Sequence, residues 1–270
     1  MPTTLHQIPR VNILGVGLSC LNLESAEHAL YTAVDTEAFQ GFVTITGVHG
    51  VVESQRDEEL KRIHNRSYLS TPDGMPMVWL AKGHGYDFVD RVYGPELMKN
   101  IMASSAPSGH RHYFYGGAEG VAETLTSSLH KEFPQLQVVG TMTPPFRPLT
   151  EAEENNLYEE LQKKRPHFLW VGLSTPKQER FAHDFLEKFP DLTKDWDHGI
   201  IFIGVGAAFD FHSGRVQQAP YWIQRSGFEW LYRITQDPKR LLKRYVIANT
   251  YFLTRIFLQL TGIKHYQQLK

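Results

Sequence analysis

Phe168–Lys188 reads FLWVGLSTPKQERFAHDFLEK, and this stretch decides the fold class. Its first four residues form a short apolar run of strand length, which ends at Gly172. A helix start follows: Thr175 has the chemistry of an N-cap, and Pro176 takes the first helical position, where a missing N–H costs nothing. A strand that turns at a glycine into a capped helix is the repeating unit of a parallel α/β sheet.

The same alternation of short apolar runs and longer amphipathic segments continues on both sides of this stretch. The expected strands are Val11–Val16, Gly41–Thr46, His112–Tyr115, Gln137–Val139, Phe168–Val171 and Ile200–Val205. The expected helices are Glu119–Glu132, Glu151–Lys164 and Pro176–Lys188, and Thr150 and Glu153 give the second a capping box. We therefore expect a Rossmann-like, mostly parallel sheet flanked by helices.

The composition changes near Ala219, beyond which strand signals stop and Trp, Tyr and Arg become frequent. Residues 233–270 hold eight cations against one acid, Asp237, so this segment carries +7 and the rest of the chain −8. Pro238–Leu260 reads as one helix with cations in its opening turns. We expect an α/β catalytic domain over residues 1–218 and a basic helical appendage over residues 219–270.

The apolar residues of Pro238–Leu260 leave two interpretations open. The helix either packs on the protein core with a basic outer edge, or lies in the lipid headgroups, where apolar burial and attraction to anionic lipid act together. We favour attachment to a membrane surface through residues 238–260 without crossing it.

The overall composition excludes several classes. A chain of 270 residues with a net charge of −1 has no general attraction to nucleic acid. Cys20 is the only cysteine, so a disulfide within the chain and a thiolate zinc cluster are both excluded, which fits a reducing compartment such as the cytoplasm. The first ten residues lack the apolar core of a signal peptide, and no apolar run approaches the roughly 18–20 residues of a membrane span.

Two loops offer groups suited to proton transfer. Thr46-Gly-Val-His49 follows an expected strand and presents a hydroxyl and an imidazole, although a plain strand-to-helix turn explains it equally. Asp73, between Pro72 and Gly74, suits a general base that deprotonates an attacking hydroxyl. The alternative is that Pro-Asp-Gly is an ordinary turn.

Two further loops are candidates for ligand binding, because ligands bind at the carboxyl ends of parallel strands. Gly172-Leu-Ser174-Thr-Pro-Lys177-Gln178 opens a helix whose free N–H groups and Lys177 favour a diphosphate, unless it is a capped helix without a ligand. Gly204-Val-Gly206, which continues to Asp210, lacks the third glycine of the dinucleotide fingerprint. A nicotinamide site is therefore a poor interpretation.

A metal-binding Asp-x-Asp pair occurs once, at Asp195-Trp196-Asp197, in a polar loop before an expected strand. A metal-diphosphate site is expected after a strand, so we interpret this triplet as a solvated loop and expect no metal or other cofactor. Arginines would then offset the charge of a departing diphosphate.

The chain resembles the WecG/TagA/CpsF family of glycosyltransferases from about Val11 to Leu253, and five ordered motifs carry the resemblance. They are Pro72-Asp-Gly-Met with Arg91-Val-Tyr-Gly-Pro-Glu-Leu-Met98, Phe114-Tyr-Gly-Gly117, Val171-Gly-Leu-Ser-Thr-Pro-Lys-Gln-Glu179, Gly204-Val-Gly-Ala-Ala-Phe-Asp-Phe-His-Ser-Gly214, and Ala219-Pro with Glu229-Trp-Leu-Tyr-Arg233 and Asp237-Pro-Lys-Arg240.

The resemblance implies an inverting glycosyltransferase that moves a sugar from a UDP-sugar to an undecaprenyl-diphosphate-linked saccharide in bacterial surface-polysaccharide synthesis, at the inner face of the cell membrane. It implies Asp73 as the base, with Thr46 and Arg91 beside it in catalysis. The resemblance adds Gln178 and, brought over the site by the appendage, Arg233, Arg240 and Arg244 to the substrate-binding residues. The others expected from the loops and motifs are His49, Gly74, Gly117, Ser174, Lys177, Gly204, Gly206 and Asp210.

The family pattern often reads Thr-x-Asn where this chain reads Thr46-Gly-Val-His49, which puts the identity of the donor sugar in doubt. Two alternatives come from other classes: a non-catalytic scaffold docked at a membrane by its tail, and an NAD-dependent oxidoreductase. The acceptor saccharide, the linkage and a homo-oligomeric state are left open by the sequence.

Overall fold

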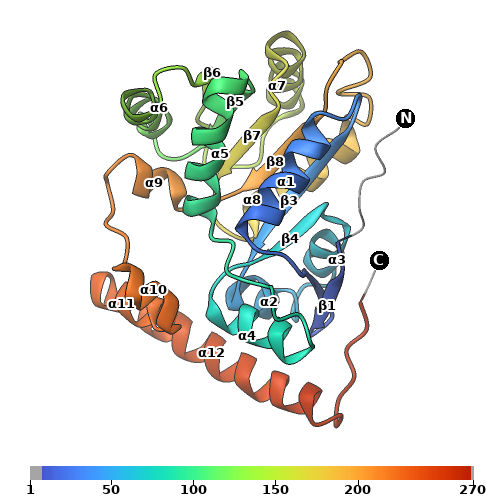
Figure 1. Ribbon diagram of the computed structural model, residues 1–270, viewed down its shortest axis with the longest axis vertical. Helices are drawn as coiled ribbons and strands as arrows, with labels where there is room; N and C mark the ends of the chain where they lie inside the picture. Colours follow the sequence, from blue (N-terminus) through green and yellow to red (C-terminus); the bar gives the residue numbers. More distant parts are fainter. Residues whose placement is uncertain (1–7, 269–270) are drawn as a thin grey trace. The chain divides into compact units, whose positions relative to one another are not determined.

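The computed structural model describes residues 8–268, apart from the side chains of Arg240 and Arg244. Its strands are β1 Arg10–Ile13, β2 Val16–Ser19, β3 Gln40–Thr46, β4 Leu69–Pro72, β5 Arg111–Gly116, β6 Gln137–Met142, β7 Phe168–Gly172 and β8 Ile200–Gly204. Its helices are α1 Leu23–Val34, α2 Val48–Glu53, α3 Glu58–Arg66, α4 Met75–Gly83, α5 Gly94–Ser108, α6 Val121–Glu132, α7 Glu151–Lys164, α8 Lys177–Lys188, α9 Ala208–His212, α10 Tyr221–Ser226, α11 Glu229–Gln236 and α12 Pro238–Leu260 (Figure 1).

Six strands form one sheet in the order β4-β3-β8-β7-β5-β6, and neighbours from β3 to β6 pair in parallel. The apolar runs of β7 and β8 are buried along their length, as expected for central strands covered on both faces. The expected Rossmann-like α/β fold with a C-terminal helix is confirmed. Strand β8 lies between β3 and β7 in this order, so the loops after β3, β7 and β8 follow adjacent strands of one sheet.

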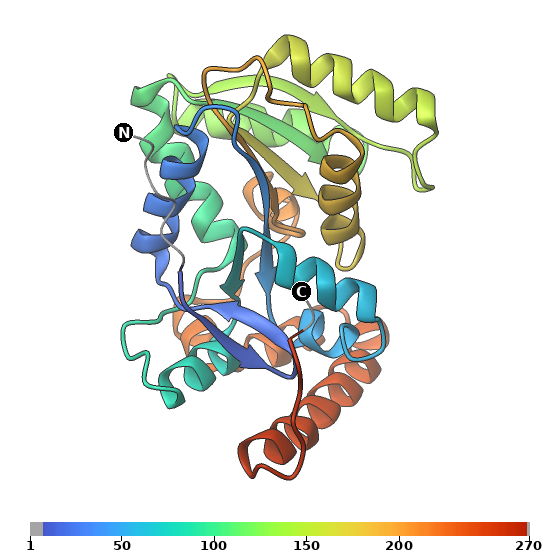
Figure 2. The ribbon, with the colours of Figure 1, turned by 90° about the vertical axis from the view of Figure 1, so that its right-hand side faces the viewer.

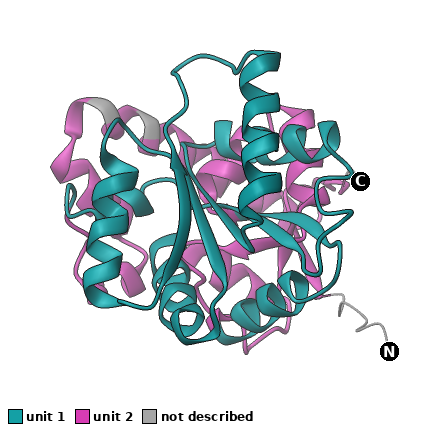
Figure 3. Ribbon diagram, turned by 90° about the horizontal axis from the view of Figure 1, so that it is seen from above, with its two compact units in different colours: residues 1–7, 24–44, 94–216 teal, residues 8–23, 45–93, 217–270 magenta. Residues whose placement is uncertain are grey.

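The described residues fall into two compact units (Figure 3). Of the described residues, unit 1 holds 24–44 and 94–216, and unit 2 holds 8–23, 45–93 and 217–268. The chain passes from one unit to the other near the end of β3. The C-terminal segment thus groups with two segments from the first third of the chain. The functional division at residue 218 stays a prediction.

The expectation of a single strand over Val11–Val16 is wrong. The segment is a hairpin in which β1 and β2 pair antiparallel as a separate two-stranded sheet (Figure 2). Leu14 and Gly15, which join the strands, both have positive φ, of 52° and 87°, as a tight primed turn requires. The turn was missed because the apolar residues Ile13 and Leu14 continue through it. Both side chains are completely buried in the core.

Two helix starts show how far local signals reach. The capping box of α7 is present: the Thr150 side chain accepts from the Glu153 N–H, and the Glu153 carboxylate accepts from the Thr150 N–H. At α8, by contrast, Pro176 lies at the N-cap and not at the first helical position. The hydroxyl of Thr175 donates to the Glu179 carboxylate, 2.9 Å away, and no side chain caps the helix.

Within unit 2, α12 buries one face and exposes another. Ala248, Phe252 and Ile256, spaced four residues apart, join a buried cluster with the β1–β2 hairpin and α2. Large apolar side chains elsewhere on α12 are exposed, namely Leu242, Val246, Ile247, Leu253, Phe257 and Leu260. In the part of the chain that the structure describes, no helix is both long enough and apolar enough to span a bilayer.

Candidate active site

Asp73 is the first residue after β4, and backbone contacts in unit 2 fix its position. Its N–H donates to the carbonyl of Thr46 at the end of β3, 3.0 Å away. Gly74 has φ 83° and leads into α4. A Cβ at Gly47 would come within 3.2 Å of the Asp73 backbone, so a glycine is needed for this close approach. The loops after β3 and β4 thus present the Asp73 side chain, one third of which is exposed (33%).

Arg91 lies beside Asp73 and is almost fully buried, with 4% of its surface exposed. Its Nη2 is 3.7 Å from Asp73 Oδ1 and also contacts the Glu229 carboxylate directly. Its Nη1 donates to Gln224 Oε1 at 3.1 Å, and the guanidinium stacks 3.9 Å from the centre of the Tyr93 ring. Among the described residues, the buried Nε–H of Arg91 has no hydrogen-bond partner. Arg91 therefore joins Asp73 to side chains from α10 and α11.

Glu229 and Arg233 extend this group by one helical turn. The two residues are four apart on α11, and Arg233 Nη2 lies 3.4 Å from Glu229 Oε1 and 3.4 Å from the Tyr93 hydroxyl. The four charges alternate in sign, from Asp73 to Arg91, Glu229 and Arg233. Loss of solvent raises the pKa of the Asp73 carboxyl, Arg91 opposes that rise, and Glu229 adds to it. Such a carboxylate is a stronger base than a solvated one.

Thr46, expected to act in catalysis, is fully buried. Its hydroxyl lies 2.8 Å from the Ser70 hydroxyl and 3.3 Å from His64 Nδ1. Burial lowers the pKa of His64 to about 4, so its ring is neutral near pH 7. The structure thus places Thr46 behind the Asp73 turn, which it supports through its carbonyl. His49 is a half-buried residue of α2, with its Nδ1 3.9 Å from Glu53.

Gln178 gives unit 1 a comparable polar group, in the first turn of α8. Its Nε2 donates to Glu179 Oε1 at 3.1 Å, and the same oxygen accepts from Thr175. Gln178 Oε1 and Glu179 Oε2 are both buried, and neither has a partner among the described residues. Burial raises the pKa of Glu179. Two buried oxygens without donors make this turn a candidate for receiving N–H or O–H groups from a ligand.

The glycines singled out in unit 1 serve close packing around Gln178. A Cβ at Gly204 would lie 3.0 Å from Gln178 Cδ, so a side chain there would displace the amide. Gly206 and Gly117 have positive φ, of 52° and 79°. Of the other expected binding residues, Ser174 and Lys177 are exposed at the start of α8, and Asp210 is half-buried in α9.

The structure therefore brings the sequence candidates together in two groups. Unit 2 holds Asp73, Thr46, Gly74, Arg91, Arg233 and His49, whereas unit 1 holds Gln178, Gly204, Gly206, Gly117, Ser174, Lys177 and Asp210. The side chains of Arg240 and Arg244 lie outside the described residues. Asp195 and Asp197 are exposed in the loop before β8. In the described part of the chain, no cluster of three His, Cys, Asp or Glu side chains is arranged to hold a metal ion.

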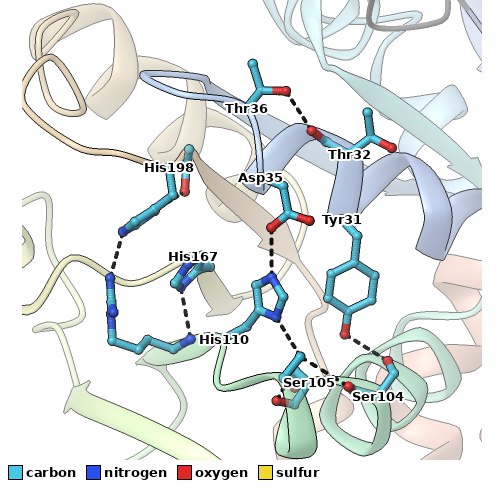
Figure 4. A network of polar contacts seen from close by, with 12 residues as sticks. Tyr31, Thr32, Asp35, Thr36, Ser104, Ser105, His110, His167 and His198 are labelled. Carbon is cyan, nitrogen blue, oxygen red and sulfur yellow. Dashed lines mark hydrogen bonds and ion pairs between the residues drawn. The ribbon is translucent and has the colours of Figure 1, made fainter. Parts of the chain in front are cut away.

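A second polar network lies in unit 1 where β5, β7 and β8 begin (Figure 4). The rings of His167 and His198 stack at 3.9 Å, and Arg111 contacts both residues, through its N–H to His167 and its guanidinium to His198. His110 pairs with Asp35 at 2.9 Å. His112 is fully buried, accepts from Trp170 Nε1 at 3.0 Å and lies 2.7 Å from the Ser105 hydroxyl.

The comparison with known proteins concerns the chain as a whole. The model of the glycosyl transferase WecG/TagA/CpsF family matches residues 11–266, nearly the whole chain. The chain belongs to this family. One relative, the N-acetylglucosaminyldiphosphoundecaprenol N-acetyl-beta-D-mannosaminyltransferase of Bacillus subtilis (strain 168), is 24% identical over 251 residues, which cover 93% of this chain and 90% of the relative. This WecG/TagA/CpsF protein is accordingly a glycosyltransferase.

Sequence reasoning assigned no role to several residues of these groups. Glu229, Gln224 and Tyr93 surround Arg91, and Glu179 holds Gln178. For Glu229 a local signal existed, because it precedes Arg233 by one helical turn. For Gln224 there was none, since its contact with Arg91 joins residues 133 apart. Tyr93 lies two residues from Arg91, but its contact with Arg233 joins residues 140 apart.

Proposed function

We propose that this glycosyltransferase moves a sugar from a UDP-sugar to a lipid-diphosphate-linked saccharide in surface-polysaccharide synthesis, with inversion at the anomeric carbon and with Asp73 as the base. The observation that carries the proposal is the partly exposed Asp73 carboxylate at a strand end, raised in pKa and held beside Arg91. The family supplies the reaction class. The relative's name supplies the kind of acceptor, a saccharide on diphosphoundecaprenol.

The chemistry is a single displacement. The acceptor hydroxyl gives its proton to the Asp73 carboxylate, and its oxygen forms a bond to the anomeric carbon from the face opposite the leaving group. The bond from that carbon to the diphosphate oxygen breaks, and its electron pair leaves with UDP. One base and one displacement give inversion. Groups that donate hydrogen bonds, such as the N–H groups at the start of α8, suit the departing diphosphate.

The relative transfers N-acetylmannosamine according to its name, so UDP-N-acetylmannosamine is the first donor to test. The departure at Thr46-Gly-Val-His49 from the Thr-x-Asn pattern is a reason to test other UDP-sugars beside it. The transfer needs no metal in this proposal, because arginine and backbone N–H groups offset the diphosphate charge.

Asp73→Asn tests the base directly. The variant keeps the size of the side chain but cannot accept the proton, so turnover should fall by roughly 10²–10⁴-fold. The assay measures sugar transfer to N-acetylglucosaminyl-diphospholipid with and without a metal chelator, and thermal unfolding with UDP shows that the variant folds and binds. A folded variant with near-normal turnover removes Asp73 from the role, and a wild-type protein that neither transfers sugar nor responds to UDP returns the scaffold alternative to first place.

We also propose that the C-terminal segment attaches the enzyme to the inner face of the cell membrane, where a lipid-linked acceptor resides. Exposed apolar side chains on α10 and α12, among them Tyr221, Trp222, Leu253 and Phe257, support this role, together with the excess of cations. The protein should sediment with vesicles that contain anionic lipid and less with neutral ones. Leu253→Glu with Phe257→Glu should reduce sedimentation several-fold, because both changes place charge where acyl chains would lie. Unchanged sedimentation would contradict the proposal.

A further inference from the structure

Glu229 lies at the centre of the charged group around Asp73, although nothing in the reaction requires an acid there. Its carboxylate contacts Arg91 on one side and Arg233 on the other. Only 17% of the side chain is exposed, so solvent screens these contacts little. Glu229 begins α11, in a part of the chain 138 residues after Arg91. Burial of a carboxylate costs solvation free energy, so Glu229 is expected to do more than form an ion pair of the surface kind.

The contacts of Arg91 show what Glu229 does to it. The guanidinium is held on the Tyr93 ring, Nη1 donates to Gln224, and Nη2 lies between two carboxylates. Glu229 is in direct contact, whereas Asp73 Oδ1 is 3.7 Å away, beyond the length of a charge-assisted hydrogen bond. Arg91 thus gives its closest ion pair to Glu229 and leaves Asp73 with a weaker one.

This division of contacts affects the chemistry of Asp73. A close, two-point pair with Arg91 would stabilise the carboxylate and make it a poor base. The charged groups that act on Asp73 are Arg91 and Arg233, which favour its ionised form, and Glu229, which disfavours it. The Tyr93 ring stacks on the Arg91 guanidinium, and Arg233 contacts the Tyr93 hydroxyl.

We propose that Glu229 is a positioning residue of the transfer reaction, which holds Arg91 away from Asp73 and so keeps the Asp73 carboxylate basic. The inference rests on the proposed role of Asp73 as the base. It assigns to α11 a part in catalysis: the helix delivers the carboxylate that sets the distance between Arg91 and Asp73.

Glu229→Gln tests the inference, because glutamine keeps the shape and still accepts from Arg91 but carries no charge. Without the negative charge at position 229, Asp73 is the carboxylate that remains paired with Arg91, and the ionised form of Asp73 becomes more stable. The acid limb of the profile of kcat/KM against pH, which reports ionisation of the base, should move to lower pH by about one unit. Turnover on the plateau should fall while the KM for the UDP-sugar changes little. Glu229→Asp, which restores the charge, should return the acid limb toward its wild-type position.

Arg225→Gln is the matched control. Arg225 lies on α10 and pairs with Asp90, the residue before Arg91, through two contacts of 2.8 and 3.0 Å. If Glu229 only docks the C-terminal helices, both glutamine variants will lower stability and leave the acid limb in place. If the inference holds, only Glu229→Gln will move the limb.

The outcomes separate this inference from the proposed function. An acid limb that stays in place in Glu229→Gln, together with an inactive Asp73→Asn, overturns the role of Glu229 and leaves the base assignment intact. An active Asp73→Asn overturns the base itself. A limb that moves to higher pH contradicts the proposed direction of the charge effect.

Discussion

The two ends of the parallel strands in unit 1 carry polar clusters of opposite kinds. Where β5, β7 and β8 begin, four histidines, Arg111, Asp35 and Trp170 satisfy one another, and within the described residues none of the buried ring nitrogens of these histidines lacks a partner. Where β7 ends, Gln178 and Glu179 each leave one buried oxygen without a partner. A satisfied network holds a structure together, and an unsatisfied one is ready for a ligand.

The difference teaches that histidine content is a poor guide to chemistry in this protein. Imidazole is the side chain most often associated with proton transfer, yet burial lowers the pKa values of His112 to about 3 and of His167 to about 2. Both rings are neutral and engaged near pH 7. The groups with chemistry to offer are carboxylates and an amide at the other strand ends, in agreement with the rule that ligands bind there.

Among the tests of this contrast, the most pronounced change is expected when the glutamine that lacks a partner for its oxygen, Gln178, is replaced by methionine. Gln178→Met removes an acceptor that has no partner among the described residues, so UDP binding should weaken roughly tenfold to a hundredfold, as expected when a buried ligand donor loses its acceptor. The variant also loses the hydrogen bond from Gln178 to Glu179, whose oxygen keeps its bond from Thr175, so the melting temperature should fall by only about 2–4 °C. Isothermal titration with UDP and thermal unfolding measure the two quantities.

Gln162→Met is the matched control on α7. Gln162 uses both ends of its amide, accepting from Trp196 Nε1 at 3.1 Å and donating to the carbonyl of Leu192. Its loss leaves two buried groups unpaired and should lower stability by about 1–3 kcal/mol without weakening UDP binding. If Gln178→Met destabilises the fold as much as Gln162→Met and binds UDP normally, the unsatisfied oxygen is not a ligand acceptor, and the comparison between the strand ends fails.

The parts of the fold that depend on local sequence were predictable. Helix α7 has the bounds and the capping box expected for it, and α12 spans Pro238–Leu260 as expected, because caps and apolar spacing are local signals. Strand β4 was missed: Leu-Ser-Thr-Pro is short and polar, and its four residues are buried only by the tertiary structure. The single strand expected over Val11–Val16 failed because a two-residue turn can hide in an apolar run.

The candidate site divides in the same way. Asp73 was found because the loop Pro72-Asp73-Gly74 marks it locally, although the strand before it was missed, and the resemblance gave Arg91 and Gln178. The neighbours that tune them could not be found, since Glu229 reaches Arg91 across 138 residues and its own helix shows only the pairing with Arg233. Charge balance at a buried site is decided by the tertiary structure, which single-sequence patterns do not encode.

The last and smallest effect concerns the dependence of stability on pH. It tests the polar network of histidines where β5, β7 and β8 begin. His112 is fully buried, and burial holds its pKa near 3 in the folded protein, against about 6.5 in the unfolded chain. The unfolded state therefore binds the proton first as pH falls, and the contribution of His112 is fully present above pH 6.5 and lost as pH falls from about 6.5 toward 3. Within that window each such histidine lowers the free energy of unfolding by about 1.4 kcal/mol per pH unit.

His112→Gln isolates this contribution, because glutamine offers Trp170 an acceptor but does not titrate. Urea unfolding between pH 7 and pH 5 should show a smaller loss of stability in the variant. The slope of the free energy of unfolding against pH should fall by about the contribution of one histidine. His28→Gln on α1 is the control, because His28 is exposed and its loss should leave the slope unchanged. Transfer activity per folded molecule should be the same in both variants at pH 7. A His112 variant that folds normally but loses activity would give the histidine end a part in the chemistry, and the contrast between the two strand ends would then have to be abandoned.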